Sequence, residues 1–261
     1  MNWIEALILG LIQGLTEFLP VSSSGHLEIG KVLLNVEVKE DLTFTVIVHF
    51  ATVLSTITVF FGEIKELSRG LLAFRWNTET KYVARILLSM VPVLVVGILF
   101  KDEVESLFSG NLTLVGGALL VTATLLISTQ LVKAGTKKIP FLDALLMGIA
   151  QAIAVIPGIS RSGATISTGL LLKNDRSEVA RFSFLMVLIP IIGAALLDII
   201  SLSSSKGEPA ISTGSLIIGF LAAYISGYLA CTWMIRLVKK GNLYWFALYC
   251  AVVGVIAIIF S

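Results

Sequence analysis

The chain has few charged residues and few of the side chains that build covalent or metal-based frameworks. Asp, Glu, Lys and Arg make up 14% of its 261 residues, about half the share in soluble proteins. Its two cysteines, Cys231 and Cys250, stand alone in apolar segments, which excludes a disulfide framework and a cysteine-rich zinc site. Hydrophobic residues make up 56%, so the composition predicts an all-α integral membrane protein. A net charge of +2 gives no indication of nucleic-acid binding.

Six stretches have the length and apolar character of a membrane-spanning helix, which needs about 20 residues. They cover residues 42–61, 81–100, 112–132, 178–200, 214–236 and 244–260. Two other regions, about 3–36 and 141–172, are apolar but interrupted by proline, glycine and serine. Their halves, roughly 14 residues each, are too short to span. Each region therefore predicts a re-entrant helix pair, which enters the membrane and returns to the same side.

The basic residues favour this layout. Of the 19 Lys and Arg residues, 14 lie in segments 62–85, 133–138, 173–181 and 236–240. The positive-inside rule places these segments in the cytoplasm and both chain ends outside. Each half then has one re-entrant pair and three spans, an odd number. We therefore expect residues 1–132 and 139–261 to form an inverted-topology repeat within a single membrane domain, 1–261.

Two polar runs at a fixed offset interrupt the two broken regions. Residues 13–26 align without a gap on residues 151–164, 138 positions later. The first copy alone has Glu17 and His26, and the second alone has Arg161. This division predicts one composite site made of two half-sites, whose serine-rich tips meet near the membrane midplane.

The ionisable residues of these runs indicate an anionic ligand. A charged side chain at membrane depth costs roughly 2.5–3.5 kcal/mol on insertion scales, so it marks a candidate functional site. Arginine favours bidentate contact with phosphate oxygens, and exposed N–H groups at a helix start bind anions. We therefore expect a phosphate or diphosphate. The expected phosphate-binding residues are Gln13, Ser22, Ser24, Ser160 and Ser162.

The residues themselves leave the reacting group open. His26 could activate Ser23 as a nucleophile, or it could activate a water. Glu17 could orient His26, or it could bind a divalent cation through oxygen with Gln13 beside it. His49 lies within a predicted span, where a hydrogen-bonded packing role and a place in the site wall both fit.

At these residues the chain resembles the undecaprenyl-diphosphate phosphatase family, which confers bacitracin resistance. The resemblance covers the whole chain in length, repeat and number of spans, and the family's motifs read here as Gln13 to Glu17, Pro20 to His26 and Pro157 to Thr165. It places the essential carboxylate on Glu17, the candidate nucleophile on Ser23, the histidine on His26, the arginine on Arg161, and supporting phosphate-site hydroxyls on Ser160 and Thr165. Gln13 stands where many members have Glu, which weakens the case for a metal ligand at that position.

The resemblance implies hydrolysis of undecaprenyl or another polyprenyl diphosphate to the monophosphate and phosphate, with Mg²⁺ or Ca²⁺ as cofactor. Such an enzyme recycles the lipid carrier of peptidoglycan synthesis. The resemblance also implies a multi-pass protein of the plasma membrane with its site open to the outer face. The sequence leaves the oligomeric state open, a homodimer included. A transporter or flippase for a polyprenyl-phosphate lipid is the alternative, because inverted repeats with broken helices are typical of transporters.

Overall fold

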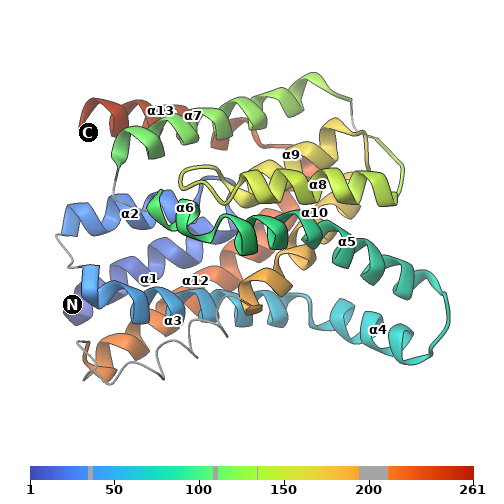
Figure 1. Ribbon diagram of the computed structural model, residues 1–261, viewed down its shortest axis with the longest axis horizontal. Coiled ribbons are helices and arrows are strands. Elements are labelled where there is room, and N and C mark those ends of the chain that lie inside the picture. Colours follow the sequence, from blue (N-terminus) through green and yellow to red (C-terminus); the bar gives the residue numbers. More distant parts are fainter. Residues whose placement is uncertain (35–37, 108–110, 134, 194–210) are drawn as a thin grey trace.

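The computed structural model describes residues 1–34, 38–107, 111–133, 135–193 and 211–261. Over these residues the chain is helical, and the only β-type pairing is two isolated bridges, Gly135 with Asp175 and Lys137 with Asn174. Most helices run along the long axis of the molecule, and both termini lie at the same end (Figure 1). The all-helical class predicted from the sequence is confirmed.

Both regions that were predicted to be broken form pairs of short helices. The first pair is α1 (Trp3–Phe18) and α2 (Ser23–Leu34), and the second is α8 (Phe141–Ile153) and α9 (Arg161–Leu171). Pro20 and Pro157 lie in the two breaks, where proline removes a backbone donor and disfavours helix in the preceding residue. The pairs enter from opposite ends of the molecule and turn back inside it (Figure 1).

Three stretches are long and apolar enough to cross a membrane. They are α5 (Thr78–Leu99), α12 (Thr213–Lys240), and Leu112–Leu131, which joins α7 (Leu112–Ser128) to the short helix η1 (Thr129–Leu131). A fourth is added if α3 (Val38–Val59) and α4 (Phe61–Leu72), bent by 75°, count as one span. α13 (Tyr244–Ile259) is apolar but only 16 residues long. The chain is therefore a multi-pass membrane protein with three or four qualifying spans among the described residues, against six predicted.

The predicted span 178–200 differs from the structure. Helix α10 (Arg176–Met186) ends early, Val187 forms a turn, and residues 188–193 are helical again. Pro190 lacks the N–H group that would bond to the Met186 carbonyl, which accounts for the interruption. Residues 194–200 of this predicted span lie outside the described residues.

Helices from the two halves of the sequence pack against each other. α1 packs on α12, α5 on α8, and α7 on α13. Small residues bring α1 and α12 close: a Cβ added at Gly14 would lie 2.5 Å from the Ala223 carbonyl oxygen and 2.8 Å from the Gly227 nitrogen. Such close approach of helix backbones is a usual means of association in membranes.

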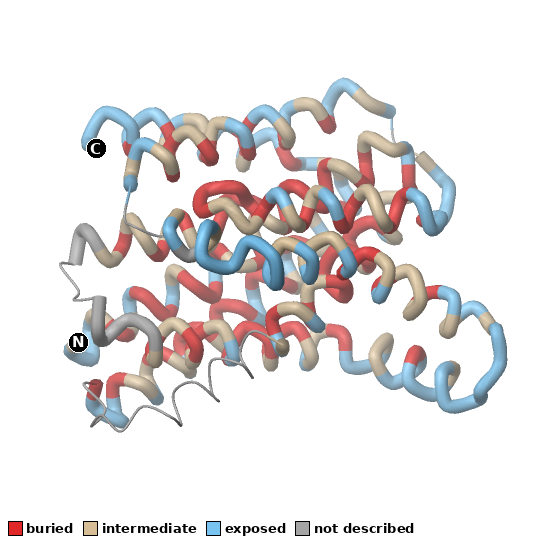
Figure 2. Tube along the Cα trace, viewed as in Figure 1, coloured by how far each residue is buried: buried red, intermediate tan, exposed pale blue. Residues whose placement is uncertain are grey.

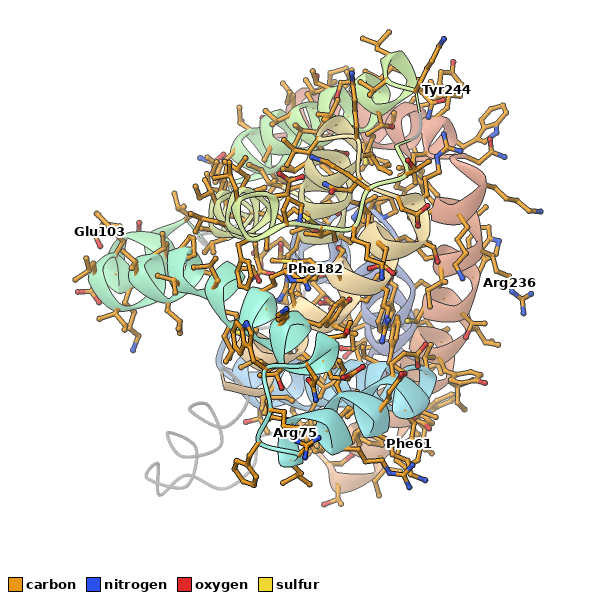
Figure 3. The ribbon with its side chains drawn as sticks, turned by 90° about the vertical axis from the view of Figure 1, so that its right-hand side faces the viewer. Phe61, Arg75, Glu103, Phe182, Arg236 and Tyr244 are labelled. Carbon is orange, nitrogen blue, oxygen red and sulfur yellow. The ribbon has the colours of Figure 1, made fainter. Side chains whose placement is uncertain are left out.

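The packing leaves a buried centre and apolar outer faces. Figure 2 shows the buried residues gathered where the helices meet, and Figure 3 shows Phe182 at this centre, with Arg236 and Tyr244 on the outside. Phe182 is fully buried, and its ring meets that of Tyr82 edge-on at 5.7 Å. Exposed side chains on α5 and α12, such as Leu94 and Ile225, are large and apolar, as helices that face hydrocarbon require. The short helix α6 (Lys101–Ser106) projects from this body and carries the exposed Glu103 (Figure 3).

We expect Gly14→Ala to destabilise the protein, because the new methyl group would overlap the Ala223 carbonyl oxygen on α12. Overpacking of this kind costs about 1–3 kcal/mol. Gly97→Ala on α5 is the matched control, since no described atom outside the neighbouring backbone of its own helix lies within 4 Å of a Cβ at that position. Thermal unfolding in detergent measures both variants. A Gly14→Ala melting temperature equal to that of the wild type would contradict the close helix contact.

Candidate active site

The tips of the two helix pairs touch each other. The backbone N–H of Gly158 donates to Ser22 Oγ at 3.1 Å, and Ser162 Oγ donates to the Leu19 carbonyl at 3.2 Å. A Cβ added at Gly25 would lie 3.2 Å from Gly158 Cα, so the two backbones are in contact. The structure thus brings together the two runs that the sequence repeat predicted to meet.

Ser22 and Ser160 cap the two helix starts in the same way. Ser22 Oγ accepts the N–H of Gly25 at 3.3 Å, and Ser160 Oγ accepts the N–H of Gly163 at 3.0 Å. Donor and acceptor are three residues apart in each case, as in an N-cap. Ser22 has a φ of 71°, a left-handed conformation that is uncommon for residues other than glycine. Its bonds to both tips hold it there.

Thr122 of α7 fixes the second tip from the side. Its hydroxyl lies 3.1 Å from the Gly158 carbonyl oxygen and accepts the N–H of Ser160 at 2.9 Å. Gly158 has a φ of 97°, and a Cβ there would lie 2.5 Å from the Val115 carbonyl oxygen. Only glycine fits this approach. The sequence reading missed Thr122, because it lies outside both polar runs.

Glu17 is the centre of the polar cluster at the tips. Its Oε2 accepts hydrogen bonds from Ser23 Oγ at 2.6 Å and from Gln13 Nε2 at 3.0 Å. Its Oε1 accepts one from a terminal nitrogen of Arg161 at 3.0 Å. The Glu17 side chain is 6% exposed, and shielding from water strengthens such charge-assisted bonds. Four predicted site residues, three from the first run and one from the second, therefore form one cluster.

A small cavity borders the Glu17–Arg161 pair. Its volume is about 20 Å³, enough for one water. Besides that pair, its polar wall consists of the hydroxyls of Thr52, Thr56, Ser162, Thr165 and Ser183. Thr165 Oγ1 and Ser183 Oγ are 2.6 Å apart. Sequence reasoning missed Thr52, Thr56 and Ser183, because single hydroxyls in apolar helices carry no pattern.

The other predicted residues lie near the cluster. Ser24 Oγ is 3.4 Å from Ser22 Oγ, and Ser160 Oγ is 3.3 Å from Ser162 Oγ. The Nδ1 of His49 lies 2.8 Å from the Thr45 carbonyl oxygen, a contact that fits the packing role. His49 is also one helical turn before Thr52 on α3, which places it next to the cavity wall.

His26 forms its hydrogen bonds with groups other than Ser23 and Glu17. Its Nδ1 lies 2.8 Å from the Ser22 carbonyl oxygen, and its Nε2 lies 2.8 Å from the hydroxyl of Tyr249. Both ring nitrogens are thus engaged by other groups. The structure therefore has neither His26 as the base for Ser23 nor Glu17 as the group that orients His26. Side chains in a helix lean toward its N-terminus, which directs this ring to the carbonyl four residues back. Tyr249, 223 residues away in sequence, was not predicted.

Gln151 is the counterpart of Gln13 in the second copy. It is 1% exposed, and its amide makes no hydrogen bond to any residue that the structure describes. Four positions further on, where the first copy has Glu17, the second has Val155. The second copy thus keeps the amide without a carboxylate for it to bind.

The oxygen donors around Glu17 suit a divalent cation such as Mg²⁺. No group of three or more His, Cys, Asp or Glu side chains that could hold a metal ion occurs within the described residues. Gln13 Oε1 is buried and has no hydrogen-bond partner there. One carboxylate, an amide oxygen and the Ser23 hydroxyl suit Mg²⁺, which usually keeps several waters and takes substrate phosphates as ligands. These residues therefore fit a cation that binds together with a phosphate compound.

Comparison with known proteins supports the family that the motifs indicated. The family model described as bacitracin resistance protein BacA matches residues 6–256. A Bacteroides fragilis protein named undecaprenyl-diphosphatase is 55% identical over 265 residues, covering 100% of this chain and 99% of the relative. Proteins with the same name from Parabacteroides distasonis and Methanobrevibacter smithii are 53% and 36% identical. They cover 99% and 98% of this chain, and 98% and 96% of those relatives.

We expect the pair Pro20→Cys and Gly163→Cys to form a disulfide in a variant that lacks Cys231 and Cys250. A Cβ added at Gly163 lies 3.4 Å from Pro20 Cβ, close to the roughly 3.5–4.5 Å found in disulfides. Pro20→Cys with Gly117→Cys is the control pair, because a Cβ at Gly117 has no described atom within 4 Å outside the neighbouring backbone of its own helix. Mobility on non-reducing gels measures both, and equal oxidation of the two pairs would argue against tips that touch.

Proposed function

The chain belongs to the bacitracin resistance protein BacA family, and we propose that it hydrolyses undecaprenyl diphosphate to undecaprenyl phosphate and inorganic phosphate. The observation that carries this function is the contact of Ser23 Oγ with the Glu17 carboxylate, beside Arg161 from the other half of the chain. A hydroxyl, a carboxylate that can accept its proton and a guanidinium for phosphate oxygens are the groups that phosphoryl transfer needs. In this role the enzyme recycles the lipid carrier of cell-wall synthesis and confers bacitracin resistance.

Ser23 is the nucleophile in the route that we favour. Its Oγ attacks the terminal phosphorus while Glu17 Oε2 accepts its proton, and the bond from phosphorus to the leaving lipid phosphate breaks. Water then attacks the phosphoserine, and Glu17 returns the proton to Ser23 Oγ as phosphate leaves. The cavity beside Glu17 has room for that water. In the alternative route, this water attacks the substrate directly, and Ser23 only donates a hydrogen bond.

The remaining groups bind the diphosphate. Arg161 uses one terminal nitrogen on Glu17, which leaves its other donors for phosphate oxygens. The hydroxyls of Ser162 and Thr165 line the same cavity, and the helix starts capped by Ser22 and Ser160 add backbone N–H groups. A Mg²⁺ or Ca²⁺ ion at Glu17 and Gln13 would neutralise diphosphate charge, and the donor set favours Mg²⁺.

The transporter alternative is not favoured. Transport of a lipid phosphate needs anion-binding groups, but it does not need a hydroxyl held against a buried carboxylate. The 2.6 Å contact of Ser23 with Glu17 is an arrangement for proton transfer.

We also propose the layout of six spans and two re-entrant pairs, related as an inverted repeat. Both termini lie at one end of the molecule and residues 62–85, 133 and 135–138 at the other (Figure 1), which supports the charge pattern. The same cap at Ser22 and Ser160, 138 positions apart, supports the repeat.

The basic end would face the cytoplasm of a cell whose plasma membrane holds the protein. The first helix pair, which carries Glu17 and Ser23, begins at the opposite end, so we expect the site to open to the outer face. The exposed apolar faces of α5 and α12 suit a second copy of the chain as well as lipid. A homodimer therefore stays a prediction.

We expect the purified protein in detergent to release phosphate from undecaprenyl diphosphate. Glu17→Gln should lower the rate roughly 10²–10⁴-fold, the usual contribution of a positioned acid or base. Glu28→Gln is the matched control: Glu28 is in the same helix pair, but its partner is Lys31 at 3.0 Å, so its loss should leave turnover near that of the wild type. No phosphate release by the wild type, or equal loss in both variants, would contradict the proposal.

The route is tested with terminally labelled substrate. Acid quench should trap label on the wild-type protein and none on Ser23→Ala, whose turnover should fall to background. If Ser23 only donates a hydrogen bond to a charged group, its removal costs about 1.5–3 kcal/mol. Substantial residual turnover without trapped label would then identify the direct route.

Arg75→Cys and Glu103→Cys, each in a variant without native cysteines, test the layout. Both side chains are exposed: Arg75 lies in the bend between α4 and α5, and Glu103 lies on α6 (Figure 3). A membrane-impermeant thiol reagent should label Arg75→Cys only from the cytoplasmic side and Glu103→Cys only from outside. Labelling of both from one side of sealed vesicles would rule out the proposed topology.

A further inference from the structure

His26 is held between two partners that together fix its ring. Its Nδ1 lies 2.8 Å from the Ser22 carbonyl oxygen, which can only accept a hydrogen bond, so Nδ1 carries a proton. In the neutral imidazole, Nε2 is then the acceptor, and the hydroxyl of Tyr249, 2.8 Å away, donates to it. The two rings are also nearly parallel, at 14°, with centroids 5.5 Å apart.

Tyr249 lies on a helix that also holds the first tip in place. The next residue of α13, Cys250, is fully buried, and its Sγ lies 3.5 Å from the Pro20 carbonyl oxygen. Two adjacent residues of α13 thus contact the break between α1 and α2 and the first turn of α2. Tyr249 itself is 44% exposed on an apolar helix. An unpaired hydroxyl in such surroundings costs free energy, and His26 removes that cost.

The phenol can hold the imidazole in both of its protonation states. When His26 is neutral, Tyr249 donates to Nε2. When His26 is cationic, Nε2–H donates to the phenol oxygen, which is also an acceptor. Neither side chain has to move, while Nδ1 stays bonded to the Ser22 carbonyl oxygen. A ring that is held in this way keeps its position during turnover, so less ordering of the ring is needed to reach the transition state.

We propose that Tyr249 is a positioning residue for His26. Its hydroxyl and its ring fix the tautomer and the plane of the imidazole beside the helix start that carries Ser23. The inference rests on the proposed function, and it adds to that function that His26, in the first turn of α2 with Ser23, takes part in turnover. Tyr249 acts through His26, and no contact of its own with the substrate is required.

Tyr249→Phe tests this, since it keeps the stacked ring and removes the hydroxyl. We expect kcat to fall roughly 2- to 10-fold, as the loss of one neutral hydrogen bond predicts, with KM unchanged. In a His26→Ala background the same substitution should have no further effect, because the group that it positions is gone. Tyr244→Phe is the matched control: Tyr244 is on the same helix, is 46% exposed, and its hydroxyl bonds to no residue that the structure describes. It should retain wild-type kinetics.

Nitrogen-15 spectra of the histidine rings give a readout that needs no turnover. The chain has only two histidines, so His49→Gln assigns both sets of signals. Tyr249→Phe should shift the Nε2 signal of His26 and leave the signals of His49 in place. Tyr244→Phe should shift neither.

Two results would overturn the inference. One is an unshifted His26 signal in Tyr249→Phe, and the other is the same loss of kcat in the presence and absence of His26, as a purely structural role would give. Failure of the proposed function is distinguishable: the wild type would then release no phosphate, while the His26 signal would still report its hydrogen bond to Tyr249.

Discussion

The constraint on which this structure depends is the need to satisfy backbone that is broken inside an apolar helix bundle. Helices broken at membrane depth leave N–H and C=O groups that neither lipid nor their own helices can bond. Here each tip supplies partners for the other. Ser22 accepts the N–H of Gly158, Ser162 donates to the Leu19 carbonyl, and Thr122 bonds to the second tip from α7. Neither helix pair has all of these partners without the other half of the chain.

The same contacts create the site. Because the tips must touch to satisfy their backbones, Arg161 at the start of α9 reaches Glu17 at the end of α1. A carboxylate in this position needs a cation and several donors, since a buried unpaired charge is costly. The donors that it has, Ser23 and Gln13, come from its own helix pair. The contacts that satisfy the broken backbone therefore also hold the reactive groups together. A substitution that separates the tips removes both.

Much of the fold and of the candidate site could be predicted from local sequence signals. The rest depends on single residues that form no pattern. The breaks in the helix pairs follow from Pro20 and Pro157, whose effect is local. The meeting of the two polar runs could be expected from the internal repeat, but the pairing of Arg161 with Glu17 could not, because the repeat aligns Glu17 with Val155 and Arg161 with Ser23. Tyr249 and Thr122 could not, because one polar residue in an apolar helix has no pattern, and its partner depends on how distant helices pack. The orientation of His26 also follows from the helix geometry around it and not from its spacing to Ser23.

Gln151 belongs to the half-site that has no carboxylate, so the two half-sites are not alike. Under the proposed inverted repeat, a duplicated chain begins with two equivalent half-sites that face opposite sides of the membrane. The second copy still has a buried amide at Gln151, without a partner among the described residues, but Val155 stands where the carboxylate would be. With the carboxylate on one tip and the guanidinium on the other, the two approaches to the site are no longer equivalent. Under that proposed repeat, one acidic group on one tip is enough to make the two sides of the site chemically different, although both tips have the same serine cap.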